Sequence, residues 1–520
     1  MQELSFEPLT PTKFLERAAF VFGDRVAVVD GGTRSTYGEF WERARRLAGA
    51  LRSLGVRPGE RVAVLAPNTR LLLEAHYGVP MAGGVIVALN VRLSPEELAY
   101  IVDHSGAGAM LYDGELEPTA RKVSELVPGD LRLVDSTEYE TLLDEATPLL
   151  LPVGDERDLL SVNYTSGTTG QPKGVMYHHR GAYLQALAMA FHGRLDPATV
   201  FLWTLPMFHC NGWCFTWAVT AAGGRHLCLP KVEPEIIWRS IREEGVTHFN
   251  AAPTVLISIA NHPAAEQGPA PRPIRVCTGG APPSPTLLAR MAELNMEVVH
   301  LYGLTETYGP ITVCEWRPEW DELPLEQQAR IKARQGVGNV VAEQMRVVDD
   351  RGNDAPADGE TMGEVALRGN DLMLGYFRDH EATAAAVPDG WFRTGDIAVM
   401  HPDGYVELRD RAKDVVISGG ENIASIEVEQ AVMSHPAVLE AAVIAHPDEK
   451  WGEVPAAYVT LKEGHSVTEE EIVEHVRGRL AHFKAPKSVT FGPLPKTSTG
   501  KIQKFVLREA AWEGHDKRIH

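Results

Sequence analysis

The chain is poor in cysteine, in positive charge and in long apolar runs. Its five cysteines are scattered over 520 residues, which fits reduced, mostly buried thiols and a cytoplasmic location better than a disulfide framework. The 50 basic residues are outnumbered by 70 acidic ones, and the formal net charge is −20. This excess of negative charge argues against a nucleic acid or an anionic membrane surface as the main partner.

The sequence also lacks a segment that we expect to cross a membrane. The longest apolar stretch, around Gly78 to Leu89, falls short of the roughly 20 residues that a spanning helix needs. The first residues have neither the basic nor the apolar region of a signal peptide, and the last three, Arg518-Ile519-His520, form no targeting tripeptide. We therefore expect a globular protein without a transmembrane segment.

Length and patterning predict an α/β fold in two domains. Residues 36–110 alternate helical and strand patterns, and further helices and buried strands follow, which indicates a large layered α/β body. From about residue 340 short strands with turns predict a small β-rich subdomain. A new unit with its own helices and strands begins after Arg411, and we interpret it as a small α+β domain. The predicted domains are 1–410 and 411–520.

One glycine- and hydroxyl-rich segment, Tyr164–Gly174, lies between the strand patterns of Leu159–Val162 and Val175–Met176. Its glycines let successive backbone N–H groups point into one concavity that attracts an anion, and Lys173 adds a mobile positive charge. A flexible linker rarely lies between two tight apolar runs. A P-loop needs Gly-Lys-Ser/Thr, whereas Lys173 stands between proline and glycine. The segment predicts a loop that grips a polyphosphate.

Several shorter motifs follow predicted strands, where open α/β sheets usually bind ligands. Each is weak alone, because a glycine turn, a turn-capping aspartate or a solvated lysine explains it equally well. The motifs are Gly279-Gly280-Ala281-Pro282-Pro283, Tyr302-Gly303-Leu304-Thr305-Glu306-Thr307, Trp391-Phe392-Arg393-Thr394-Gly395-Asp396, Arg411-Ala412-Lys413-Asp414, Ile417-Ser418-Gly419-Gly420-Glu421-Asn422 and Pro495-Lys496-Thr497-Ser498-Thr499-Gly500-Lys501.

Together and in this order, the motifs resemble the adenylate-forming superfamily of acyl-CoA synthetases, carrier-independent ligases and luciferases. The resemblance extends over nearly the whole chain, from about Tyr37 to Lys501. The segments Met207–Cys214 and Tyr177–Arg180 look most like a branch of short- and medium-chain acyl-CoA ligases that includes methylmercaptopropionate-CoA ligases and plant acyl-activating enzymes.

The resemblance implies an AMP-forming acid–thiol ligase that uses ATP, Mg²⁺ and coenzyme A. ATP and a carboxylic acid would give an acyl-adenylate and pyrophosphate, and CoA would then give acyl-CoA and AMP. The acid would be a short- to medium-chain fatty, thioether or aryl acid, and a homodimer is compatible with this reading. Two alternatives remain open at this point: an enzyme that passes its acyl group to a separate carrier protein, and a non-catalytic nucleotide-binding protein.

The resemblance also implies roles for individual residues. Tyr302 would stack on adenine, Asp396 and Arg411 would hold the ribose, and Thr165 and Glu306 would help to position Mg²⁺. The full set of implied ATP contacts is Thr165, Ser166, Gly167, Thr168, Thr169, Gly170, Lys173, Gly279, Gly280, Ala281, Pro282, Tyr302, Gly303, Thr305, Glu306, Asp396, Arg411 and Lys501.

The implied catalytic residues are Lys501, Thr168 and Glu306, with Lys413 as the hinge about which the small domain would rotate between the two half-reactions. Gly419, Gly420 and Glu421 would line the route of the CoA arm, and Asn422 stands where many relatives carry an arginine. The acid pocket would be walled by His209, Asn211, Gly212 and Trp213. The bulk of Trp213 favours short or medium acids, although Trp213 and Cys214 fit the core of an apolar helix equally well.

Overall fold

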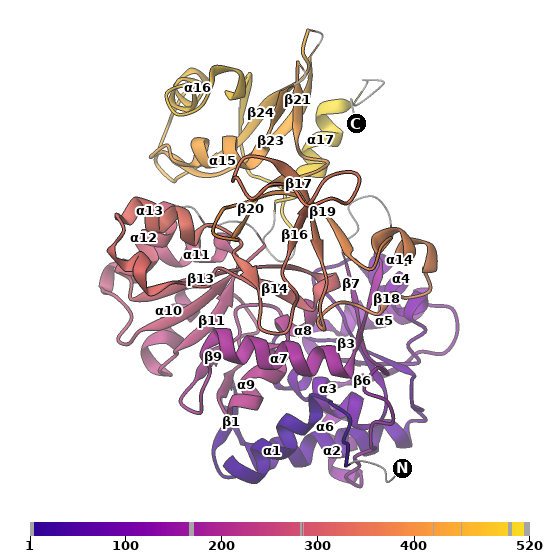
Figure 1. Ribbon diagram of the computed structural model, residues 1–520. Coiled ribbons are helices and arrows are strands. Elements are labelled where there is room, and N and C mark those ends of the chain that lie inside the picture. The colour runs from indigo at the N-terminus through magenta and orange to yellow at the C-terminus, as the bar shows by residue number, and fades with distance from the viewer. Residues whose placement is uncertain are drawn as a thin grey trace.

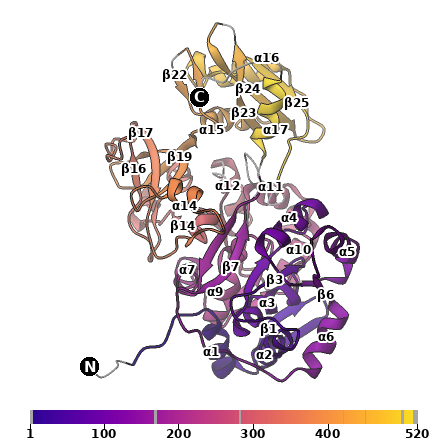
Figure 2. The ribbon, with the colours of Figure 1, turned by 90° about the vertical axis from the view of Figure 1, so that its right-hand side faces the viewer.

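The computed structural model of the protein describes residues 5–165, 171–280, 283, 285–419, 421–448, 450–497 and 502–513. It has the predicted fold class, with a large α/β body, a β-rich subdomain and a smaller α+β unit (Figures 1 and 2). No helix in these ranges is long and apolar enough to span a membrane. The division of the chain between residues 410 and 411 stays a prediction.

The body is built on two sheets whose central strands are parallel. Side by side, the first sheet contains β18 (Gly375–Tyr376), β8 (Gly174–His178), β7 (Leu159–Tyr164), β4 (Val85–Ala88), β3 (Arg61–Leu65), β5 (Ala109–Tyr112) and β6 (Arg132–Asp135). The second contains β15 (Val337–Gly338), β14 (Gly309–Val313), β13 (Met296–Leu304), β12 (Ile274–Thr278), β11 (His248–Ala251), β9 (Val200–Leu202), β10 (Arg225–Leu227), β1 (Val26–Asp30) and β2 (Thr33–Thr36).

Two smaller sheets follow in the last third of the chain. The β-rich subdomain is an antiparallel sheet of β16 (Arg346–Val348), β17 (Met362–Leu367), β19 (Phe392–Met400) and β20 (Val406–Arg411). The C-terminal sheet contains β22 (Glu421–Ile423), β21 (Val416–Ser418), β24 (Gly452–Leu461) and β23 (Val438–Asp448), with β25 (Ser488–Phe491) paired to β24.

Helices cover the sheets (Figure 2). Those of the body and subdomain are α1 (Thr12–Phe22), α2 (Tyr37–Ser53), α3 (Arg70–Met81), α4 (Pro95–Ser105), α5 (Glu117–Leu126), α6 (Ser136–Glu145), α7 (His179–Gly193), α8 (Cys210–Trp213), α9 (Phe215–Ala222), α10 (Pro234–Glu243), α11 (Pro253–Asn261), α12 (Pro285–Glu293), α13 (Leu325–Lys332) and α14 (His380–Ala386). Those of the C-terminal unit are α15 (Ser425–Met433), α16 (Glu469–Arg477) and α17 (Lys504–Trp512).

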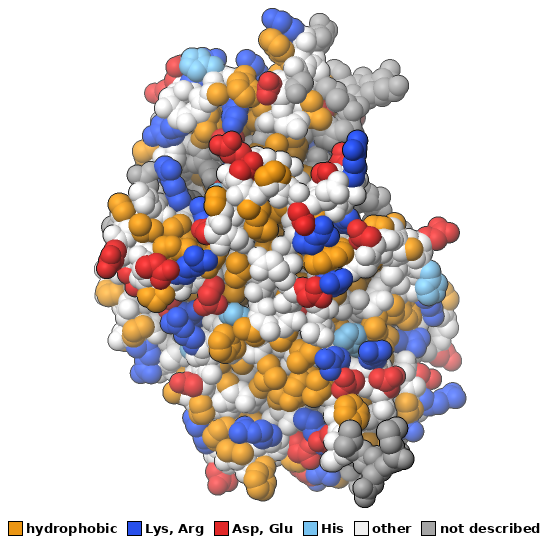
Figure 3. All heavy atoms as spheres, viewed as in Figure 1, with side chains coloured by type: hydrophobic (Ala, Val, Ile, Leu, Met, Phe, Trp, Pro, Cys, Tyr) orange, Lys and Arg blue, Asp and Glu red, His pale blue; other side chains and the backbone are white. Residues whose placement is uncertain are grey.

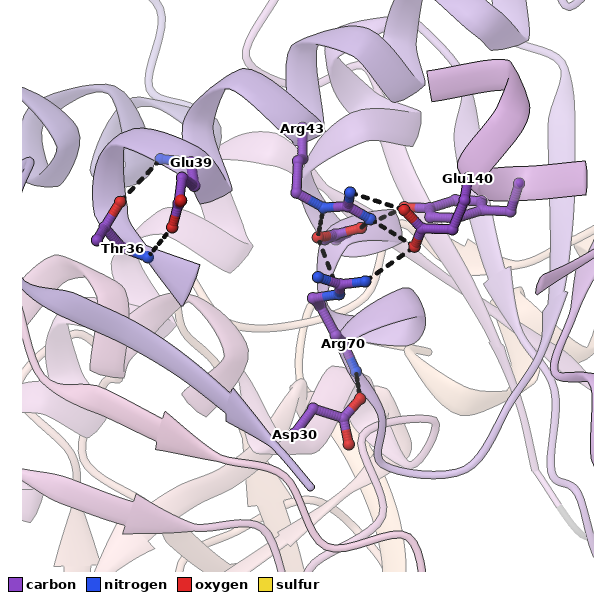
Figure 4. A network of polar contacts seen from close by, with 8 residues as sticks. Asp30, Thr36, Glu39, Arg43, Arg70 and Glu140 are labelled. Carbon is purple, nitrogen blue, oxygen red and sulfur yellow. Dashed lines mark hydrogen bonds and ion pairs between the residues drawn. The ribbon is translucent and has the colours of Figure 1, made fainter. Parts of the chain in front are cut away.

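Local chemistry explains where the first long helix begins. Thr36 caps α2 by accepting a hydrogen bond from the backbone of Glu39, and the Glu39 carboxylate accepts one from the backbone of Thr36 (Figure 4). The helix then buries Phe40, Ala44 and Leu47, each at most 1% exposed, against the body core. The sequence predicts this apolar face, because Phe40, Ala44, Leu47 and Leu51 recur at helical spacing between residues 37 and 54.

A partly buried ionic network connects three helices of the body (Figure 4). Arg43 of α2 pairs with Glu74 of α3 at 2.6 Å and with Glu140 of α6 at 2.8 Å. Arg70 reaches the same Glu140 carboxylate at 2.9 Å, and Tyr139 donates a hydrogen bond of 2.6 Å to Glu74. Because Glu74 is fully buried, this set of partners compensates the cost of taking its charge out of water.

Charges of both signs are interspersed over the face of the molecule shown in Figure 3, and apolar side chains gather over α7. Leu187 and Phe191 of that helix are 40% and 65% exposed. Since α7 also packs on α9 with its other side, the helix is apolar nearly all round.

One buried carboxyl makes stability depend on pH. Asp371 is fully buried, accepts a hydrogen bond of 2.9 Å from Asn339, and burial raises its pKa to about 7. The unfolded chain ionises this group near pH 3.8, so the free energy of unfolding should fall as the pH rises from there to about 7. We expect Asp371→Asn to melt at a higher temperature than the native chain at pH 8 and to lose that advantage at pH 4. Equal differences at both pH values would contradict the assignment.

Candidate active site

The polyphosphate loop predicted from sequence leaves the first sheet between two paired strands. Strands β7 and β8 are antiparallel, with Tyr164 opposite Gly174, and the backbone N–H of Thr165 donates to the carbonyl of Lys173 at 3.0 Å. The two ends of the loop are thus held together, and we call this pairing of Thr165 with Lys173 the neck of the loop. Five of its predicted ATP contacts, Ser166, Gly167, Thr168, Thr169 and Gly170, lie outside the described residues.

A tyrosine connects this neck to the predicted magnesium residue. The ammonium of Lys173 lies over the ring of Tyr376, 4.7 Å from its centre, and the Tyr376 hydroxyl donates to Glu306 Oε1 at 2.8 Å. Burial, and then the Glu306 charge, raise the pKa of Tyr376, so its hydroxyl stays protonated and donates. The structure therefore brings Lys173 and Glu306 to one place.

Backbone hydrogen bonds explain why Lys173 and Glu306 lie close together. Strand β18 pairs with β8, so that Tyr376 lies opposite Val175, and the N–H of Phe377 donates to the carbonyl of Gly174 at 2.7 Å. The N–H of Met373 donates to the carbonyl of Glu306 at 2.8 Å. One short segment is therefore bonded to the end of the loop on one side and to Glu306 on the other.

A second group gathers where β19 and β20 run side by side. Asp396 is directly opposite Arg411 in the ladder, and its Oδ1 lies 2.8 Å from Arg411 Nε. Its Oδ2 accepts a hydrogen bond of 2.6 Å from the hydroxyl of Tyr302. Asp396 is 3% exposed, and burial followed by the Asp396 charge raises the pKa of Tyr302. Three residues distant in sequence thus form one polar cluster.

Glycines allow close backbone approach beside this cluster. A Cβ at Gly279, just after β12, would lie 2.9 Å from the carbonyl oxygen of Leu301 and 3.0 Å from the Trp213 ring. A Cβ at Gly303 would collide with the carbonyl oxygen of Gly309. Gly280 has a φ of 88°, which favours glycine, while Ala281 and Pro282 lie outside the described residues.

The segment predicted to wall the acid pocket has an unusual backbone. Every residue from Cys210 to Cys214 has a positive φ, between 50° and 63°. A left-handed turn costs about 1–2 kcal/mol for each residue with a side chain. All five residues are buried, so their packing against the rest of the body compensates the cost of this backbone conformation. The alternative of an ordinary apolar helix applies only from α9 onward, because α8 is left-handed.

The side chains of this left-handed turn lie in different surroundings from one another. Trp213, 7% exposed, packs against Gly279 and Gly309. Asn211 is fully buried, and its Oδ1 accepts bonds of 2.8 Å from Ser161 and Asn163. His209 precedes the turn and is half-buried, whereas a Cβ on Gly212 would collide with Trp203. The indole of Trp213 therefore separates the Gly279 loop from β14.

Thr305 links the turn to the Glu306 region. The thiol of Cys210 lies 3.7 Å from Thr305 Oγ1, and the hydroxyl of Tyr177 donates to the Thr305 carbonyl at 2.6 Å. Burial raises the pKa of Cys210 to about 12. The thiol is therefore neutral and unsuited to act as a nucleophile.

The predicted hinge and CoA residues lie at the start of the C-terminal unit. The carbonyl of Lys413 accepts a hydrogen bond of 3.4 Å from Arg508, and Lys413 is half-buried. Gly419 has a φ of 60° and packs against the ring of Trp451, while Glu421 and Asn422 are exposed in β22. Gly420 and Lys501 lie outside the described residues, although Lys496 and Ile502 pair on either side of Lys501.

Sequence reasoning missed Tyr376, Tyr177 and the buried pair Ser161 and Asn163. No motif surrounds Tyr376, and its role follows only from the pairing of β18 with β8. Ser161 and Asn163 are two residues apart in β7, so both side chains point to the same face of the strand. Two polar residues at this spacing in an otherwise apolar strand are the sequence signal that could have identified them.

Two family models match the chain. The one for AMP-binding enzymes matches residues 15–377, and the one for the C-terminal domain of these enzymes matches residues 427–501. The chain is 45% identical to an acetate–CoA ligase of Humulus lupulus over 98% of this chain and 96% of that protein. It is 44% identical to a peroxisomal acetate/butyrate–CoA ligase of Arabidopsis thaliana, over 98% and 95%.

Solved structures agree with these matches. The crystal structure of ATP-bound MatB from Rhodopseudomonas palustris superimposes with a TM-score of 0.85, at 26% identity, and the similarity covers 97% of this chain and all of that one. Both domains of the fold are therefore shared with an ATP-binding relative.

Proposed function

Because the chain belongs to the family of AMP-binding enzymes and aligns end to end with CoA ligases, we infer that it is an AMP-forming acyl-CoA synthetase. The reaction joins a carboxylic acid to CoA in two steps, with ATP as the source of energy. One observation carries the proposal for the site: Asp396, Arg411 and Tyr302 form a buried polar cluster, and the strand that carries Tyr302 is followed directly by Thr305 and Glu306.

We propose that this cluster binds the nucleoside of ATP. Tyr302 and Arg411 already use one lone pair on each oxygen of Asp396, and each oxygen can accept a further bond from a ribose hydroxyl. The two donors also fix the carboxylate so that it need not be ordered when ATP binds. The Tyr302 ring and the close backbone of Gly279 and Gly280 fit a flat base beside the ribose.

The phosphates would lie at the other end of the site. The Thr165 neck holds both ends of a loop with many N–H and hydroxyl donors, and Lys173 supplies the nearby positive charge. Thr168, within that loop, is proposed as a further phosphate contact. Thr305 lies between this region and the left-handed turn, where the α-phosphate and the acid would meet.

Magnesium fits the available donors. Glu306 presents a carboxylate and Thr165 a hydroxyl, the oxygen ligands that Mg²⁺ prefers, and Mg²⁺ commonly takes only one or two carboxylates together with substrate phosphates. When bound, the ion would neutralise charge on the phosphates. Tyr376 orients the Glu306 carboxylate for this purpose through its hydroxyl.

The first step brings two anions together. A carboxylate oxygen of the acid attacks the α-phosphorus of ATP, the bond to pyrophosphate breaks, and the acyl-adenylate forms. Lys501 is proposed to neutralise the developing charge, so positioning and positive charge supply most of the rate enhancement. The small domain then rotates about Lys413 and brings the Gly419–Glu421 turn to the site. The CoA sulfur attacks the acyl carbon, and AMP leaves.

We propose a short- to medium-chain acid as substrate because Trp213 fills the space beside Gly279 and Gly309. The relatives named for acetate and butyrate support this size class. His209 and Asn211 flank the same wall, although Asn211 is engaged by Ser161 and Asn163 and therefore orients the turn. Aryl and thioether acids remain in the proposed class.

Trp213→Ala should move the preference toward longer acids. We expect kcat/KM to fall about tenfold for butyrate and to rise for octanoate, because each methylene in an apolar pocket contributes about 1–3 kcal/mol to discrimination. Phe215→Leu, a buried change in the neighbouring α9, is the matched control for lost packing. The measurement is acyl-CoA formation across a series from acetate to dodecanoate. An unchanged order of preference would remove Trp213 from the pocket.

The proposal also covers the acceptor of the acyl group, the cellular compartment and the oligomeric state. Supplying either CoA or an acyl carrier protein to the enzyme with ATP and acid tests the acceptor, and we expect turnover with CoA. All five cysteines are buried and free of disulfides, which supports the cytoplasm, whereas several relatives are named peroxisomal. Fractionation of native cells decides between these compartments, and light scattering tests the homodimer.

A further inference from the structure

A buried polar cluster joins the β-rich subdomain to the C-terminal unit. Its members are Asp410, Ser425, Glu429 and Lys504, and we call it the hinge cluster. Asp410, near the end of β20, is 2% exposed, and its Oδ2 accepts a hydrogen bond of 2.5 Å from the backbone N–H of Ser425. Ser425 is the first residue of α15 and is fully buried. The Asp410 carboxylate therefore binds the positive end of that helix.

Lys504 completes the cluster from the last helix. Its ammonium donates to Ser425 Oγ at 2.5 Å and pairs with Glu429 Oε1 at 2.6 Å. Burial alone would lower the pKa of Lys504, but Glu429 and then Asp410 raise it above its ordinary value. The ammonium is therefore charged, and it faces two carboxylates that belong to different parts of the chain.

The members of the hinge cluster lie on both sides of Lys413, the proposed hinge, in the sequence. Asp410 precedes Lys413, whereas Ser425, Glu429 and Lys504 follow it. A rotation about Lys413 therefore separates Asp410 from the other three. The buried pair of Arg508 and Asp414 differs in this respect, because both of its members follow Lys413 and move together.

In this structure the C-terminal unit faces the body through Lys496. Lys496 lines a cavity of about 210 Å³ together with Pro234 and Ile237 of α10 and Thr254 and Ser258 of α11. Lys496 also pairs with Ile502 across the segment that contains Lys501. The base of this segment therefore faces the body, which fits the role proposed for Lys501 in adenylation.

We propose that the hinge cluster is a latch that holds the C-terminal domain in the adenylation orientation and that opens before the thioester step. Asp410 acts as a positioning residue, because it would act through the orientation of the C-terminal domain and not on the reacting atoms. The inference rests on the proposed function, because only a two-step reaction uses two orientations. Breaking the latch should favour the second orientation at the expense of the first.

The test compares the two half-reactions in Asp410→Asn. ATP–pyrophosphate exchange measures adenylation, and conversion of supplied acyl-adenylate to acyl-CoA measures the thioester step. We expect the ratio of the first rate to the second to fall about tenfold, because the variant loses a buried charge-assisted contact in one orientation only. Ser425→Ala removes only the hydroxyl bound by Lys504, a contact within the C-terminal unit, so this variant should leave the ratio unchanged.

Glu427→Gln is the matched control. Glu427 lies on the same helix α15 and pairs with Lys484 at 2.7 Å, but both residues belong to the C-terminal unit. This variant should leave the ratio unchanged. Equal changes of both half-reactions in Asp410→Asn would overturn the latch and leave the function standing. Absence of pyrophosphate exchange in the native enzyme with every acid tested would instead overturn the function itself.

Discussion

Replacing Lys501 by alanine should lower the rate of adenylation by about a thousandfold. In the proposed reaction the carboxylate and the α-phosphate repel each other, and an ammonium between them offsets that repulsion where charge develops. In the proposed reaction Lys501 serves only the first orientation of the small domain. Formation of acyl-CoA from supplied acyl-adenylate should therefore stay within about threefold of the native rate.

Lys487→Ala is the control for this experiment, because Lys487 is an exposed lysine of the same unit. It should leave both half-reactions unchanged. An equal loss of both half-reactions in Lys501→Ala, with the control intact, would contradict a role confined to adenylation.

Asp396→Asn should lower kcat/KM for ATP by about a hundredfold, mainly through a higher KM. The asparagine keeps the shape of the side chain but loses the charge that Arg411 contacts at 2.8 Å. Its NH₂ group replaces one of the two accepting oxygens and cannot accept a bond from Tyr302, Arg411 or a ribose hydroxyl. A buried donor left without its partner costs about 1–3 kcal/mol. Initial rates of pyrophosphate release at varied ATP and at varied acid provide the measurement.

The matched control is Asp389→Asn, which removes an exposed pairing with Arg393 in the same subdomain. The KM for ATP should not change in that variant. A rise in the KM for the acid, with the KM for ATP unaltered in Asp396→Asn, would place Asp396 outside the nucleotide site.

Much of the fold follows from local sequence. The aliphatic run Arg61–Leu65 predicts a strand, and the structure has one with the same bounds. Thr468, followed by three glutamates, predicts the N-cap of a helix, and the structure has a capping box of Thr468 and Glu471 there. Both depend on short-range patterns: a run of buried aliphatic residues in one case and a hydroxyl followed three residues later by a carboxylate in the other.

The residues of the candidate site fall into two groups: those that local motifs predict and those that depend on tertiary contacts. Asp396 and Arg411 are predictable because each stands in a motif, and the ladder of β19 and β20 brings them together. The left-handed turn at 210–214 is not predictable from propensity, because its strain is held by tertiary packing. Tyr376 and the hinge cluster likewise depend on contacts between residues far apart in the chain.

The central claim is that ATP is cleaved to AMP and pyrophosphate while an acid is joined to CoA. The most direct measurement is the quantification of AMP, ADP and acyl-CoA from purified enzyme with ATP, Mg²⁺ and CoA. The acids should range from acetate to dodecanoate, with benzoate, cinnamate and methylmercaptopropionate added. We predict equal amounts of AMP and acyl-CoA with at least one short or medium acid, and no AMP accumulation beyond one turnover without CoA. Release of ADP in place of AMP, or no acyl-CoA with any acid, would contradict the account.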